Sequence, residues 1–140
     1  TTNNIMLNAM QSALAESGDA DSQLLSDEIG YWSAGREAYS RRDYDEAMKA
    51  YEITLGLNLR NPAVYFDRGL THLAQDNPEL GLSDFNTALS LAEEEDIARF
   101  WREHIAAAIV SNAQLHAVWW QQRDSYASLV PIVPTPTLAP

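Results

Sequence analysis

The stretch Tyr31–Leu91 decides the fold, and it reads YWSAGREAYSRRDYDEAMKAYEITLGLNLRNPAVYFDRGLTHLAQDNPELGLSDFNTALSL. It repeats itself at a step of thirty-four residues, with large residues recurring as large ones and small residues as small ones. The first copy carries Tyr31, Gly35, Asp43, Tyr44, Glu46, Ala47, Tyr51, Leu55 and Leu57. Their counterparts are Tyr65, Gly69, Asn77, Pro78, Leu80, Gly81, Phe85, Leu89 and Leu91. A fixed period of this length indicates stacked supersecondary units that bury a common core.

The spacing predicts two helices joined by a tight turn in each copy, because neither helix can bury its apolar stripe alone. A glycine inside the first helix costs up to about 1 kcal/mol relative to alanine, and this is tolerated where two helices approach closely. A small residue on the second helix allows the same approach, and an aromatic residue on that helix fills the space between one unit and the next. We therefore expect structural roles for six residues: Gly35, Ala47, Tyr51, Gly69, Gly81 and Phe85.

Capping residues place the helix boundaries of the two copies. Asp43 precedes the second helix of the first copy, and Asn77-Pro78 does so in the second, with a side-chain cap and proline at the first helical position. Asn61-Pro62 opens the second copy in the same way. The expected helices run over about 22–41, 44–58, 62–75 and 78–91, followed by a further pair over about 97–110 and 113–126.

This pattern resembles the tetratricopeptide repeat, whose period is thirty-four residues. The resemblance covers about half of the chain, with repeats over about 28–61 and 62–95 and a degenerate third over 96–126. In the third copy, Glu103 or His104 falls where the small residue should be. The resemblance implies an all-α, helix-turn-helix superhelix over 21–126, with an N-terminal capping helix over 1–20 and an extended, proline-rich tail over 127–140.

In tetratricopeptide repeats, the first helices build a concave wall that binds partners. The resemblance places that wall at Trp32, Arg36, Tyr39, Phe66, Leu70 and Leu73. Members that hold a C-terminal carboxylate use Lys, Asn and Arg at such positions, so the carboxylate-clamp activity is not carried over to this chain. The wall is expected to be apolar and aromatic, with Arg36 as its cation.

The tail over 127–140 is expected to be extended, since prolines recur at positions 131, 134, 136 and 140. It is too apolar for a pure spacer, and its expected contact residues are Leu129, Val130, Ile132, Val133 and Leu138. Aromatic grooves bind proline-rich segments because such segments have little chain entropy left to lose. We hypothesise that the tail of one copy docks in the groove of another, forming a ring or a filament. The alternatives are a tail that folds back over its own groove and an N-terminal helix that fills the groove.

No residue pattern predicts catalysis. The histidines at 72, 104 and 116 belong to no metal-binding motif, the glycines are isolated, and cysteine is absent. We expect no enzymatic activity, no metal and no cofactor. The alternative from another functional class is an enzyme or metal protein that uses His104, His116 and the acidic run at 93–96. That run is better explained as acids in the first turn of a helix, where the dipole stabilises them.

The composition narrows the class of partner. A net charge of −11 argues against a nucleic-acid surface, and no run of eighteen apolar residues predicts a membrane span. The first residue is Thr1 and the tail is rich in Thr and Pro, as in exported proteins, so we expect an exported chain, with a cytoplasmic one as the alternative. The expected function is a self-associating structural subunit of an extracellular assembly or filament. The alternative is an adaptor or scaffold that binds another protein's peptide or helix.

Overall fold

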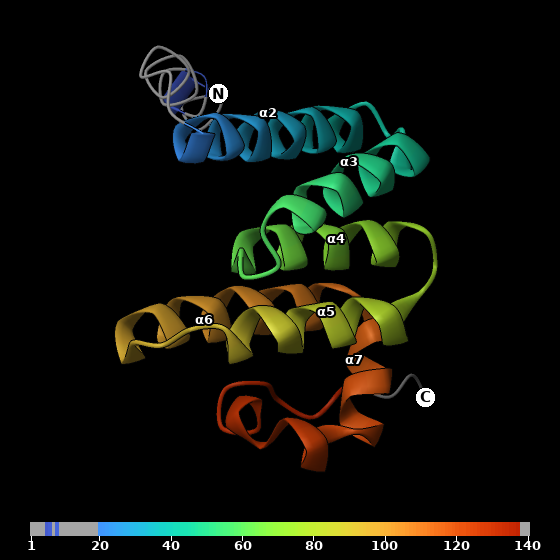
Figure 1. The fold of residues 1–140 in the computed structure, drawn as a ribbon. Helices are drawn as coiled ribbons and strands as arrows, with labels where there is room; N and C mark the ends of the chain where they lie inside the picture. Colours follow the sequence, from blue (N-terminus) through green and yellow to red (C-terminus); the bar gives the residue numbers. More distant parts are fainter. Residues whose placement is uncertain (1–4, 7, 9–19, 138–140) are drawn as a thin grey trace. The chain divides into compact units, whose positions relative to one another are not determined.

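In a computed structural model, which describes residues 5, 6, 8 and 20–137, helices follow one another along the chain (Figure 1). The elements are α2 (Ala20–Ser40), α3 (Tyr44–Leu57), α4 (Pro62–Ala74), α5 (Pro78–Ser90), α6 (Glu95–Ser111), α7 (Ala113–Gln121) and the 3-10 helix η1 (Arg123–Leu129). The described residues form no strand, so the all-α prediction is confirmed. Most of the expected capping helix over 1–20 lies outside the described residues. None of the helices described is long and apolar enough to cross a membrane.

The turns that close the first two helical hairpins have the same geometry. Arg42 and Asp76, thirty-four residues apart, both adopt a left-handed conformation, with φ of 64° and 62°. In each turn the next residue's backbone N–H reaches back five residues: Asp43 to the Ala38 carbonyl and Asn77 to the His72 carbonyl, both at 2.9 Å. Asp43 also caps α3 by accepting a hydrogen bond from the Glu46 N–H. The sequence repeat is therefore matched by a repeat in local backbone structure.

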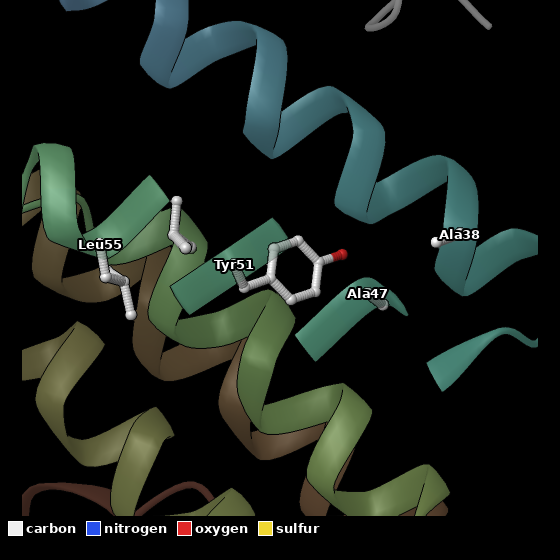
Figure 2. Packing of buried hydrophobic residues seen from close by; sticks show 5 residues of the cluster. Ala38, Ala47, Tyr51 and Leu55 are labelled. Atoms are coloured by element: carbon white, nitrogen blue, oxygen red, sulfur yellow. The ribbon is translucent and has the colours of Figure 1, made fainter. Parts of the chain in front are cut away.

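The described residues divide into two compact units, and the division falls within α4, between Asp67 and Arg68. In the first unit, α2 and α3 pack around a buried cluster that includes Ala38, Ala47 and Tyr51 (Figure 2). A Cβ added at Gly35 would lie 2.5 Å from the Tyr51 ring. No real Cβ tolerates such a distance, so the absence of a side chain at Gly35 makes room for the aromatic ring.

The loop between α3 and α4 is held by a carboxylate that the sequence analysis did not single out. Glu28 on α2 is buried and accepts hydrogen bonds from the side-chain amide of Asn58. It also accepts one from the Asn61 amide at 2.8 Å. Hydrogen bonds to a charged acceptor are stronger than neutral ones. This carboxylate therefore fixes the start of α4 relative to α2.

Burial of the Tyr51 hydroxyl predicts that the first unit loses stability at alkaline pH. Burial raises the pKa of Tyr51 above its ordinary value of 10.0, and the charge of Asp67 raises it further, while Arg36 lowers it. The folded chain thus holds this proton more tightly than the unfolded chain does. The resulting stability is fully present below pH 10.0 and is lost as the pH rises above it. We expect Tyr51→Phe to flatten this loss, measured as the urea midpoint between neutral and alkaline pH. An unchanged slope would contradict this assignment.

The second unit repeats the glycine–aromatic contact. A Cβ added at Gly69 would lie 2.6 Å from the Phe85 ring and 3.1 Å from the Gly81 carbonyl oxygen. Around this contact, α5, α6 and α7 bury a larger apolar set. Its fully buried members include Leu82, Phe85, Ala88, Ile105, Ile109, Leu115 and Trp119.

A buried ionic group joins α4 to α5 within the second unit. Arg68 donates two hydrogen bonds to the Asp84 carboxylate, both at 2.8 Å, and His72 Nε2 lies 3.5 Å from the same group. The corresponding residues of the first copy, thirty-four positions earlier, are alanines at 34, 38 and 50. The two hairpins thus share their glycine–aromatic contacts but differ in the polarity of their helix interface.

The segment from Ala127 onward was predicted to be extended, but its first part is not. The 3-10 helix continues to Leu129, and a turn follows in which the Val133 N–H donates to the Leu129 carbonyl at 3.0 Å. Leu129 and Val133 are buried, whereas Val130 and Ile132 are nearly half exposed. The prediction was wrong here because proline ends regular helices but does not prevent short turns between prolines.

Candidate functional site

An indole and a carboxylate form the centre of the candidate site, which lies in the first unit. Trp32 on α2 donates a hydrogen bond from Nε1 to Oδ2 of Asp67 on α4, at 2.7 Å. Trp32 also packs against the core cluster with one side of its ring and is half-buried. Its orientation is therefore fixed from two directions, by apolar packing and by a hydrogen bond to a charged acceptor.

Arg36 lies one turn beyond Trp32 on the same face of α2. Its guanidinium carbon is 5.8 Å from the centre of the Trp32 ring, and its Nε is 3.8 Å from Oδ2 of Asp67. The distance to Asp67 is longer than a hydrogen bond, and the distance to the Trp32 ring is within the range of a cation–π contact. The Arg36 side chain is 34% exposed, so its N–H groups can reach a partner. We name Trp32, Arg36, Tyr39 and Asp67 the indole–guanidinium cluster.

Tyr39 extends this cluster toward the end of α2. It is half-buried against the core and makes an edge-to-face contact with Tyr44, with ring centres 5.5 Å apart. Burial raises the pKa of the Tyr39 hydroxyl, and so do the nearby Tyr44 and Asp67. The hydroxyl therefore stays protonated at neutral pH and can donate a hydrogen bond.

Asp67 is the most strongly desolvated charge of the cluster. Burial raises its pKa, while the hydrogen bond from Trp32 and the charge of Arg36 lower it. Because the folded chain holds this proton more tightly than the unfolded chain, protonation stabilises the fold. The contribution of Asp67 to the free energy of unfolding is therefore greatest near and below its ordinary pKa of 3.8 and falls as the pH rises through the folded value.

Two substitutions separate the charge of Asp67 from its hydrogen bond. Asp67→Asn keeps an acceptor for the indole without the buried charge, so we expect neutral-pH stability at or above that of the wild type. It should also remove the Asp67 part of the pH dependence above its ordinary pKa of 3.8. Asp67→Ala leaves the indole N–H without this acceptor and should lower the free energy of unfolding by about 1 kcal/mol. Urea unfolding followed by tryptophan fluorescence measures both. Equal effects of the two variants would contradict the role of the hydrogen bond.

The other residues expected in the groove do not all join this cluster. Phe66 belongs to the first unit and is half-buried on α4. Leu70 and Leu73 belong to the second unit and are also half-buried. Leu73 packs against Gly81, where an added Cβ would meet its Cδ2 at 2.9 Å. The structure thus groups Trp32, Arg36 and Tyr39 in one unit and directs Leu73 toward its own hairpin.

The groups considered for a metal site do not come together in the described part of the chain. His104 is exposed on α6 and its Nδ1 lies 2.8 Å from the Phe100 carbonyl oxygen. His116 is buried on α7, where its Nε2 lies 2.7 Å from the Pro134 carbonyl oxygen. Among the residues described, no three His, Cys, Asp or Glu side chains are placed to hold a metal ion. Glu95 and Asp96 lie in the first turn of α6.

Comparison of the chain with protein-family models, curated proteins and solved structures found no match. The geometry of the indole–guanidinium cluster is therefore the basis on which a function can be inferred. That cluster offers an aromatic face, donor groups on Arg36 and a carboxylate, and these are the chemical groups of a non-covalent binding surface. Asp67 was missed because a single aspartate on a predicted helix has no distinguishing spacing. The pairing with Trp32 becomes visible only when α2 and α4 are placed together.

Proposed function

We propose that this chain is a non-enzymatic protein–protein interaction module, in which the indole–guanidinium cluster binds an extended segment of a partner protein. The observation that carries the proposal is the position of the Arg36 guanidinium and the lack of a close hydrogen bond to Asp67. The guanidinium lies within cation–π range of the Trp32 ring, and its Nε is 3.8 Å from the Asp67 carboxylate, which is longer than a hydrogen bond. Arginine and aromatic residues are enriched where binding energy concentrates in interfaces.

Pre-organisation supports this assignment. Trp32 is fixed by its hydrogen bond to Asp67 and by the core, so little side-chain entropy remains to be lost when a partner binds. The aromatic rings of Trp32 and Tyr39 suit a proline-containing extended segment, which also arrives with little freedom to lose. The N–H groups of Arg36 can donate to backbone carbonyl groups of such a segment. In this form the chain acts as an adaptor or scaffold.

Arg36→Ala tests the proposal with little risk to the fold, because this side chain is partly exposed and makes no close hydrogen bond to Asp67. We expect about tenfold weaker binding of those proline-containing peptides that the wild type binds in an array, measured by fluorescence anisotropy, since a central arginine contributes more than 1 kcal/mol. The matched control is Arg41→Ala, which removes an exposed arginine paired with Glu37. Equal affinities of the two variants would contradict a binding role for Arg36.

Self-association is the second candidate, and a specific observation favours it. Residues 125–140 contain no charged side chain, although the chain carries a net charge of −11. Val130 and Ile132 lie in this uncharged part and are nearly half exposed. Two acidic chains can thus approach each other here with reduced repulsion. In this form the chain is a structural subunit of an extracellular assembly or filament.

The structure changes how such a contact would form. Leu129 and Val133, two of the five residues expected to enter another copy's groove, are buried in the second unit of their own chain. A tail-in-groove contact would therefore have to expose them first. This cost is the reason that we place the adaptor before the structural subunit.

A further inference from the structure

Residues 133–136, Val-Pro-Thr-Pro, are held on the second unit by a small number of identifiable contacts. Val133 is 3% exposed, and the Pro134 carbonyl oxygen lies 2.7 Å from Nε2 of His116. A carbonyl oxygen can only accept, so Nε2 carries the proton and donates. The backbone of the preceding turn closes on Leu129, whose carbonyl accepts hydrogen bonds from the N–H groups of Ile132 and Val133.

Beyond these contacts the segment stands away from the helices. A cavity of about 500 Å³ separates residues 134–137 from the end of α6 and the start of α7. It is lined on the helix side by Val110, Ser111, Ala113 and His116, and none of its lining residues is charged. Within the segment Val133 is buried and Pro136 is half-buried, whereas Pro134, Thr135 and Thr137 are exposed, so the packing against the helices is not continuous.

We propose that this surface of α6 and α7 is a recognition site for the Val-Pro-Thr-Pro segment, and that the segment of a second copy occupies it in exchange for the chain's own. The inference rests on the second candidate function, self-association, and gives that function a site distinct from the indole–guanidinium cluster. The occupant is inferred from the chain's own segment, which already lies on this surface. It is a short uncharged segment with a valine at the buried position and a proline carbonyl that accepts a hydrogen bond from His116.

Exchange between copies is favoured by three features. The same contacts are made whether the segment comes from the same chain or from another, so an exchanged contact loses none of them. The segment carries no charge, which limits repulsion between two acidic chains. Val130 and Ile132, exposed in the turn that would act as the hinge, become available to cover each other when two chains meet.

A peptide of residues 130–137, added to the full chain, tests the recognition site. In Val133→Asp the chain's own segment is displaced, and we expect this variant to bind the peptide at least about tenfold more tightly than the wild type. The tethered segment of the wild type competes at an effective concentration that reaches about the millimolar range. The control is Ser128→Asp, an exposed position that precedes the turn and lies outside the peptide, which should behave like the wild type. Failure of a still-helical Val133→Asp chain to bind, or equal binding by all three, would overturn the proposal.

A second experiment leaves Val133 intact and detects exchange directly. The chain contains no cysteine, so Ala113→Cys and Thr135→Cys, at two positions that line the same cavity, give chains with one thiol each. After mixing and mild oxidation with oxidised glutathione, we expect mixed disulfide dimers in excess of the dimers that each variant forms alone. No such excess at concentrations where light scattering shows self-association would overturn the exchange. The outcome of this experiment is independent of peptide binding to the indole–guanidinium cluster, which Arg36→Ala tests.

Discussion

Gly69→Leu is expected to unfold the second unit. The Cβ alone would lie 2.6 Å from the Phe85 ring, and Phe85 is completely buried, so the ring cannot turn outward without losing its buried position. The Gly81 carbonyl, at 3.1 Å, closes the other side. Even Gly69→Ala should lower the free energy of unfolding by about 2 kcal/mol, because overpacking strain of up to about 3 kcal/mol exceeds the gain of up to about 1 kcal/mol in helix propensity.

Gly56→Ala is the matched control for these substitutions. Gly56 also lies within a helix, α3, but a Cβ added there would meet nothing within 4 Å. Alanine at this position should therefore raise stability by up to about 1 kcal/mol. Thermal unfolding followed by circular dichroism compares the variants. Wild-type stability of Gly69→Leu would mean that the helices of this hairpin do not pack through Gly69.

Arg68→Ala is expected to cost about 3 kcal/mol of unfolding free energy. It removes both hydrogen bonds to Asp84, whose side chain is only 8% exposed, and leaves a buried carboxylate without its arginine. His72 remains 3.5 Å from that carboxylate and reduces the loss when it is protonated. Chemical unfolding at neutral pH gives the value.

The double variant Arg68→Ala/Asp84→Ala reproduces the alanines found thirty-four positions earlier in the first copy. Replacing both members of a buried ion pair is less costly than removing one, because no uncompensated charge remains. We therefore expect the double variant to be more stable than Arg68→Ala alone. A loss equal to the sum of the two single variants would show that the pair is not coupled.

The sequence predicted the parts of the fold that depend on local spacing. Gly35 and Gly69 were expected where two helices approach closely, and the structure places an aromatic ring of the next helix directly against each glycine. Glycine within a helix lowers stability, so its presence at these two positions indicated that a side chain would not fit there. Tyr51 and Phe85 were expected instead to fill the space between one unit and the next. Helices begin after Asp43 and Asn77 as expected, but only the Asp43 side chain makes a capping hydrogen bond and Asn77 makes none.

Contacts between residues far apart in the chain were less predictable. Trp32 and Asp67 are separated by thirty-five positions, and Glu28 and Asn61 by thirty-three. Neither pair has a spacing that distinguishes it from surface residues on a helix. The C-terminal turn was missed for another reason: the prolines suggested an extended chain, whereas burial of Leu129 and Val133 holds this segment against the second unit. Local propensity was outweighed by tertiary packing.

The residues predicted to line one groove do not form one cluster, again because contacts between residues far apart in the chain could not be predicted. Helix register assigned Trp32, Arg36, Tyr39, Phe66, Leu70 and Leu73 to one wall. The structure shows that polar contacts organise only part of it, because the carboxylate of Asp67 holds Trp32 and lies near Arg36. The proposed site is thus smaller and more polar than the apolar aromatic groove that the sequence predicted.

The most direct test of the proposed function is the response of the indole N–H signals to a proline-rich peptide. The chain contains four tryptophans, and their indole signals in a ¹H–¹⁵N spectrum are assigned by single Trp→Phe substitutions. On titration with a poly-L-proline decamer, we predict a saturable shift of the Trp32 signal, since its N–H donates to Asp67 within the cluster. The signals of Trp101 and Trp119, which are buried in the second unit, should stay in place. A spectrum in which Trp32 does not respond while the other signals do, or in which none responds, would contradict binding at the indole–guanidinium cluster.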